Sequence, residues 1–258
     1  MVLTLNLFIF LFGLIAGSFL NCVIYRLEKR RSFLKGRSCC PKCSHQLNWY
    51  DLMPVFSYLL LRGKCRYCKK SISFQYPLIE LATGFLFLAV FNPEYAVRTF
   101  YLLLVTCLLI IIFIYDLKHY IIPDKIIFPA IAIALFYNLF LLLTGDYSLA
   151  RFLNMIYAGF WPALFFFLIF FLSRGKWLGF GDIKLVFFMG IFLGFPEVLA
   201  ALFLAVFFGG IIGIGLIIAK IKKIKSEIPF GPFLIIGTYL ALFFGQDLVN
   251  WYLNLIFL

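Results

Sequence analysis

Eight apolar runs, separated by short polar connections, dominate this chain of 258 residues. The runs lie at about 2–25, 76–91, 99–115, 126–143, 152–172, 183–195, 198–219 and 233–257. A helix that spans a bilayer needs about 20 mainly apolar residues, and several of these runs reach that length. Only 13% of the residues are charged, against about a quarter in soluble globular domains. The pattern predicts an all-α, polytopic membrane protein with about eight transmembrane helices.

The basic residues concentrate on one side of this topology. Of the 23 Lys and Arg residues, 21 fall in the same set of connections, namely 26–75, 116–125, 173–184 and 220–232. The positive-inside rule assigns that side to the cytoplasm, which places both termini outside. The first run lacks a preceding basic segment and a following small-residue cleavage site, so we expect a retained helix rather than a signal peptide. Topology accounts for the net charge of +12, and no nucleic-acid partner is expected.

The connection 26–75 is the only sizeable polar segment, and it contains two C-x-x-C pairs separated by 21 residues. The four cysteines are Cys40, Cys43, Cys65 and Cys68. This spacing is typical of a tetrahedral Cys₄ zinc site, and four thiolates leave no position open for water. We therefore expect a structural zinc ion. Disulfides are the alternative, but a reducing cytoplasm disfavours them. Neither Cys39 nor His45 is expected to be a ligand.

These features divide the chain into three predicted parts. Residues 1–25 form the first transmembrane helix, 26–75 a cytoplasmic zinc-binding loop domain, and 76–258 the membrane core. Between the cysteine pairs, the segment DLMPVFSYLLL, residues 51–61, has the pattern of a short amphipathic helix that lies on the membrane.

Three carboxylates lie at or within the edges of apolar spans on the cytoplasmic side: Glu80, Asp116 and Asp182. Ionisable groups at membrane depth are functional candidates by default. The topology places Asp116 and Asp182 at the same membrane face. If they meet, one can accept a proton from water while the other donates one to a carbonyl oxygen, as in an aspartyl protease. The alternative is that each caps a helix or pairs with Lys118 or Lys184.

Several other motifs restrict the choice of chemistry. Gly179 and Gly181 let the backbone before Asp182 pass close to a neighbouring helix or a substrate. Asp124 is expected to be the N-cap of the fourth span. The glycine-rich run 207–216 indicates helix packing through small residues. No H-E-x-x-H motif occurs, which excludes a metalloprotease. No G-x-S-x-G or P-loop motif occurs either, so a serine hydrolase and a P-loop nucleotide-binding protein are unsupported.

Together these motifs resemble the GxGD class of membrane aspartyl proteases, and within it the type IV prepilin leader peptidases. YD at 115–116 and GFGD at 179–182 are typical of the class. Further motifs occur in the family's order over nearly the whole chain, from GSFLNCVIYRL (17–27) to IPFGPFLIIG (228–237). The resemblance implies that Asp116 and Asp182 are catalytic. The surrounding motif residues are Gly179, Gly181, Lys184, Pro229 and Gly231.

The resemblance also implies a function. Such enzymes remove the short basic leader of prepilins and pseudopilins, the substrates of type IV pili and type II secretion, at the cytoplasmic face of the bacterial inner membrane. Members with the four-cysteine loop typically also methylate the new N-terminal amine with S-adenosylmethionine. Glu80 is a candidate contact for the substrate's ammonium group, or else forms a structural pair with a basic residue.

Two other functions remain open from the residues alone. One is a presenilin-like protease that cleaves within transmembrane helices, although the zinc loop disfavours it. The other is a transporter with the two aspartates as an ion site, which would require broken helices near the bilayer midplane. The segment IPFGP, residues 228–232, breaks helix geometry. It either pairs with an extended substrate near the aspartates or simply ends a loop.

Overall fold

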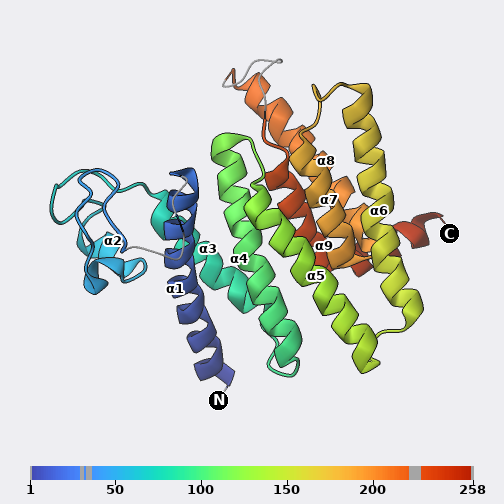
Figure 1. Ribbon diagram of the computed structural model, residues 1–258, viewed down its shortest axis with the longest axis horizontal. Coiled ribbons are helices and arrows are strands. Elements are labelled where there is room, and N and C mark those ends of the chain that lie inside the picture. The colour runs from blue at the N-terminus through green and yellow to red at the C-terminus, as the bar shows by residue number, and fades with distance from the viewer. Residues whose placement is uncertain (1, 30–31, 33–36, 221–227, 257–258) are drawn as a thin grey trace. The chain divides into compact units, whose positions relative to one another are not determined.

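The computed structural model describes residues 2–29, 32, 37–220 and 228–256, and these ranges contain helices and no β-strand. The order is α1 (Val2–Glu28), the 3₁₀ helix η1 (Trp49–Leu52), α2 (Phe56–Leu60), α3 (Gln75–Val90), α4 (Ala96–His119), α5 (Asp124–Thr144), α6 (Leu149–Leu172), α7 (Phe180–Leu193), α8 (Glu197–Ile218) and α9 (Gly231–Ile256) (Figure 1). The predicted all-α class is confirmed.

Each of the eight apolar runs corresponds to one long helix, but not every helix is long enough to cross a bilayer. Within the described residues, α1, α4, α5, α6, α8 and α9 have the required length and composition. By contrast, α3 has 16 residues and α7 has 14. At 1.5 Å per residue they reach about 24 and 21 Å, short of the roughly 30 Å of a hydrocarbon core. The multi-pass membrane class is supported, and the count of eight complete spans is not confirmed.

The chain divides into two compact units, Met1–Ile111 and Ile112–Leu258, so α4 begins in the first and ends in the second. In the first unit α1 packs along α3. The backbones approach closely, because a Cβ at Gly17 would lie 2.7 Å from the Cα of Glu80 and one at Gly13 would lie 2.7 Å from the Cα of Gly84. Small residues of this kind permit close helix contact within membranes.

In the second unit α7 is the central helix, with α5, α6, α8 and α9 packed around it. Leu185, Phe188 and Met189 of α7 are completely buried. A helix that is apolar all round is expected to be enclosed by other elements. At Gly190 the backbone of α7 lies against that of Ala158 in α6, with no room for a side chain. Other helices therefore enclose most of the middle of α7, the helix that is too short to span a bilayer.

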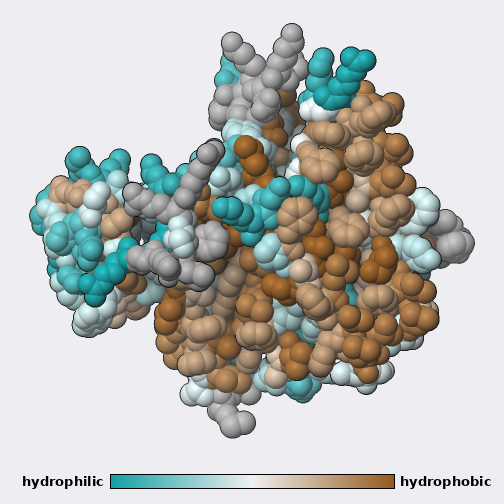
Figure 2. All heavy atoms as spheres, in the orientation of Figure 1, coloured by the Kyte–Doolittle hydropathy of each residue, from teal (hydrophilic) through white to brown (hydrophobic). Residues whose placement is uncertain are grey.

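Many large apolar side chains are exposed on the second unit. Figure 2 shows mostly apolar residues on the face turned to the viewer, over α5 and α6. The exposed side chains of these helices include Phe136, Phe165 and Phe171. This is the surface that a helix bundle presents to lipid tails, and it matches the membrane class inferred from the sequence.

The expected single helix over residues 51–61 is wrong. The chain forms η1, which ends at Leu52, and α2, which starts at Phe56. Pro54 explains the break, because proline disfavours the helical conformation of the residue before it, and Met53 is extended. Val55 follows with a positive φ of 61°. Three exposed apolar side chains, Phe56, Leu59 and Leu60, nevertheless lie together on the short helix α2.

Candidate active site and candidate metal centre

Asp116 lies in the last turn of α4 and is 4% exposed. The backbone N–H of Gly231, the first residue of α9, donates a hydrogen bond to its carboxylate. A Cβ at Gly231 would lie only 2.6 Å from Oδ2 of Asp116, so only glycine permits this approach. The unpaired N–H groups and the positive end of the helix dipole favour a negative charge at this place. The start of α9 is therefore an anion-stabilising support for Asp116.

The Oδ2 atom of Asp116 differs from most buried polar atoms. Oδ2 is buried and has no hydrogen-bond partner within the described ranges. Most buried polar atoms in proteins are paired, and an exception calls for an explanation. A carboxyl that exchanges a proton with a neighbour or a substrate provides one.

Asp182 is the third residue of α7 and is partly exposed. Its Oδ2 accepts a hydrogen bond of 3.2 Å from the N–H of Gly179, so it caps its own helix. The carboxylate also lies within electrostatic reach of Asp116. A Cβ at Gly181 would be 2.9 Å from Cβ of Ile122, which shows why the chain needs glycine there. Asp182 therefore both caps its helix and lies near Asp116, although the sequence presents these two roles as alternatives.

Lys184 pairs with Asp124 and not with Asp182. Its Nζ lies 2.5 Å from Oδ1 of Asp124 and about 5 Å from the ring centroids of Phe128 and Phe180. The expectation that Asp124 is an N-cap is wrong, because the extended residue Pro123 occupies that position and Asp124 begins the helix. The ion pair instead joins the start of α5 to the start of α7, beside the two aspartates.

The two aspartates thus have complementary surroundings at one end of the second unit. Asp116 is buried, has an unpaired oxygen and faces the N-terminus of α9, whereas Asp182 is partly exposed and lies in the first turn of α7. The helix ends favour ionisation, while two negative charges close together disfavour each other. Such a pair is suited to hold one proton between two carboxylates and to act as acid and base together.

In the first unit the four predicted cysteines form a cluster. The Sγ atoms of Cys40, Cys43, Cys65 and Cys68 all lie within 4.8 Å of one another. A tetrahedral zinc site with Zn–S bonds of about 2.3 Å separates its sulfur atoms by about 3.8 Å. The donor set and the spacing therefore fit a zinc ion, and neither Cys39 nor His45 belongs to the cluster.

The two cysteine pairs adopt the same backbone geometry. The N–H of Cys40 donates to the carbonyl of His45, and the N–H of Ser44 donates to the carbonyl of Cys40, both at 2.9 Å. Cys65 makes the same two bonds with Lys70 and Lys69, also at 2.9 Å. Ser44 and Lys69, at equivalent positions, both have positive φ. Two equivalent turns that present their sulfur atoms to one point are what a Cys₄ zinc site requires.

Polar contacts hold the intervening segment against the second turn. Asp51 accepts hydrogen bonds from Nε of Arg66 at 2.8 Å and from the hydroxyl of Tyr67 at 3.0 Å. Partial burial alone would raise the pKa of Asp51, but these hydrogen bonds outweigh it and hold the pKa below its ordinary value. His45 packs on the ring of Tyr67 with centroids 3.6 Å apart. His45 thus has a packing contact between the two turns.

Glu80 is bonded inside the first unit. It is 7% exposed, and its Oε2 accepts a hydrogen bond of 2.8 Å from the N–H of Val55. The hydroxyl of Ser18 in α1 also bonds to it. Glu80 therefore links α1, α3 and the start of α2. The sequence indicated a possible structural role but not these partners, since neither is a basic residue and no spacing rule connects them.

Comparison with known proteins adds to this geometry. Residues 11–93 match the family model described as "Bacterial Peptidase A24 N-terminal domain", and residues 103–214 match "Type IV leader peptidase family". Similar curated proteins are named "Prepilin leader peptidase/N-methyltransferase". The one from Aeromonas salmonicida is 34% identical over 96% of this chain and 94% of its own. The one from Pseudomonas aeruginosa is 30% identical over 95% and 92%. No solved structure matches the chain.

The cysteine cluster generates a metal prediction. We expect purified protein to contain about one zinc ion per chain, because four thiolates satisfy its coordination shell. Changing Cys40 or Cys65 to serine should release the metal, as measured by elemental analysis. Cys39→Ser is the matched control and should retain it. Protein without metal, with disulfides between these cysteines in mass spectra, would contradict the assignment.

Proposed function

The chain belongs to the type IV leader peptidase family, and on that premise we propose that it removes the basic leader of prepilins and pseudopilins and methylates the new N-terminal amine. The observation that carries the peptidase proposal is that Asp182 lies within electrostatic reach of the buried carboxylate of Asp116, with the side chain of Ile122 against both Gly231, beside Asp116, and Gly181, next to Asp182. The family membership supports an endopeptidase of the aspartyl class.

The proposed mechanism assigns the chemistry to the two carboxylates as one unit. The ionised carboxylate takes a proton from water, and the water oxygen attacks the carbonyl carbon of the scissile peptide bond. The protonated carboxyl gives its proton to the carbonyl oxygen, so a neutral tetrahedral intermediate forms. When the C–N bond breaks, the carboxyl that took the proton from water donates it to the leaving amine, and the other carboxylate takes a proton from a hydroxyl of the intermediate, so both return to their starting state.

The substrate class fits the position of this pair. A prepilin has an apolar helix held in the membrane and a basic leader on the cytoplasmic side. Its scissile bond would then lie at the membrane boundary, the depth that the topology predicts for Asp116 in the last turn of α4 and Asp182 in the first turn of α7. A transporter is less well supported, because an ion site near the bilayer midplane requires interrupted helices, and these aspartates lie at helix ends.

Zinc and S-adenosylmethionine would have different roles. The four cysteines would hold a zinc ion that stabilises the loop domain of residues 26–75, with the peptidase core in residues 76–258. S-adenosylmethionine supplies a methyl group when bound. We assign Glu80 a structural role rather than a contact to the substrate amine, because hydrogen bonds from Val55 and Ser18 already occupy its carboxylate.

We further propose that the active site faces the cytoplasm and that both termini lie outside. Cysteines placed at Lys118 and Lys176 should resist a membrane-impermeant thiol reagent in intact cells, since the excess of basic residues marks their side as cytoplasmic. Cysteines at Glu94 and Asp146 should be labelled. All four positions are exposed on the protein, so permeabilised cells should label each and provide the control. External labelling at 118 or 176 would overturn the orientation.

The carboxylate pair generates a prediction about catalysis. Asp116→Asn and Asp182→Asn should each reduce prepilin cleavage by about a thousandfold or more, since each removes the acid–base exchange while keeping the shape. The double variant should be no worse, because the two residues act as a unit. Cleavage of a purified prepilin in detergent measures this.

Asp124→Asn is the matched control for these variants. It removes the ion pair with Lys184, but Asp124 is largely exposed, and exposed ion pairs contribute little to stability. This variant should keep most of the cleavage activity, and all variants should keep the metal. Near-normal cleavage by either single variant of the pair would refute the aspartyl mechanism.

A further inference from the structure

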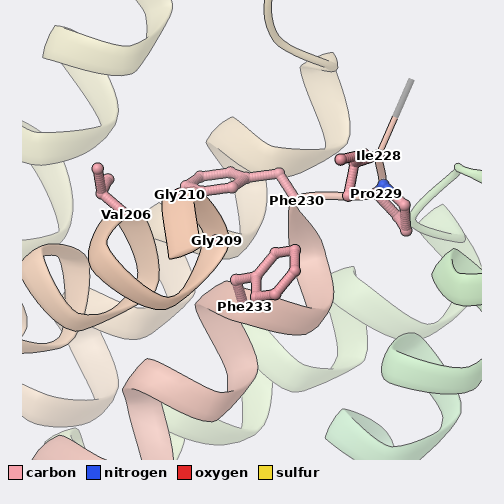
Figure 3. Close-up of a pocket in the computed structure, with 7 residues that line it drawn as sticks. All are labelled: Val206, Gly209, Gly210, Ile228, Pro229, Phe230 and Phe233. Atoms are coloured by element: carbon pink, nitrogen blue, oxygen red, sulfur yellow. The ribbon is translucent and has the colours of Figure 1, made fainter. Parts of the chain in front are cut away.

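An apolar cavity of about 310 Å³ lies between α8 and the start of α9. Its lining consists of Val206, Gly209, Gly210, Ile228, Pro229, Phe230 and Phe233 (Figure 3). None of these side chains is charged or can donate a hydrogen bond. An apolar cavity of about 150 Å³ is large enough to bind benzene. The space therefore suits one large apolar side chain.

The cavity adjoins the carboxylate pair through a single short segment of chain. Gly231 contacts the carboxylate of Asp116, while the residue before it, Phe230, lines the cavity. Consecutive Cα atoms are only about 3.8 Å apart. If the scissile bond of a substrate lies at the aspartates, a residue only a few positions away from that bond can therefore reach the cavity. The mouth reaches the apolar surface of the protein, since Val206 is 58% exposed.

The glycines of α8 keep this space open. The sequence indicated that they serve helix packing, and this holds only in part. A Cβ at Gly209 would meet Phe233 at 3.4 Å, and one at Gly213 would meet Ile228 at 3.6 Å, which are ordinary contacts. A Cβ at Gly210 would meet nothing within 4 Å, and the same is true of Gly215. Gly210 lines the cavity and Gly215 does not.

We propose that this cavity receives a large apolar side chain of the prepilin, from the apolar segment on the mature side of the cleavage point. The inference rests on the proposed function and adds a specificity site to it. The basic leader does not suit an uncharged apolar lining, because a charge placed there would lose its hydration without a partner. The apolar segment of the substrate does suit this lining, and the cavity opens to the apolar surface of the protein, which that segment can contact.

Filling the cavity tests the proposal. Gly210→Leu places a side chain in open space, so the helix tolerates it, and leucine is a better helix former than glycine. Its KM for prepilin should rise about tenfold, the scale expected when an apolar side chain loses its pocket. Val206→Phe, which fills the cavity from another position, should have the same effect. Gly215→Leu is the matched control and should keep the wild-type KM.

Substrate variants identify the occupant. Each large apolar residue within the first four positions after the cleavage point is changed to alanine in turn. For one of these prepilins, wild type and Gly210→Leu should show equal KM, because filling the pocket costs nothing further once the side chain that it binds is absent. An unchanged KM in Gly210→Leu would overturn the proposal. So would an equal rise for every substrate, which would indicate a lipid chain in the cavity. If wild type and Gly215→Leu cleave no prepilin, the proposed function fails instead.

Discussion

The carboxylate of Asp116 is buried among apolar residues and has lost most of its hydration. Other groups of the second unit must offset that loss. An ionised carboxylate without partners in an apolar interior is strongly unfavourable. Here the start of α9 supplies an N–H from Gly231 and the positive end of a helix dipole. Asp182 receives the same support from the start of its own helix α7. Three helix ends therefore lie around the two carboxylates, and two negative charges close together favour a state in which the pair carries one proton.

Close backbone approaches make this convergence possible. Gly231 reaches Asp116 and Gly181 reaches Ile122 because neither carries a Cβ. Gly190 lets α7 lie directly against α6 and occupy the centre of the unit. The Asp124–Lys184 pair joins the starts of α5 and α7 at the same end. The motif glycines thus permit close backbone contacts, and these contacts hold the two carboxylates at helix termini, where positions are well defined.

Much of this was accessible from sequence because the relevant signals are local. Apolar runs predicted the eight long helices, and the spacing of Cys40 to Cys68 predicted the cysteine cluster, since both depend on short-range patterns. Tertiary arrangement was less accessible. A run such as 183–195 reads the same whether lipid or other helices surround it, so the central place of α7 was not foreseen. The partners of Asp124 and Glu80 lie far away in sequence, and Pro54 overrode the apolar pattern of residues 51–61.

The central claim is that the two aspartates form one acid–base unit that cleaves prepilin. The most direct test is the pH dependence of kcat/KM for cleavage of a purified prepilin in detergent. A unit that holds one proton is active only when one carboxylate is ionised and the other is protonated, so the account predicts a bell-shaped profile with two apparent ionisations. A profile that is flat, or that falls on one side only across the range in which the protein stays folded, would contradict it.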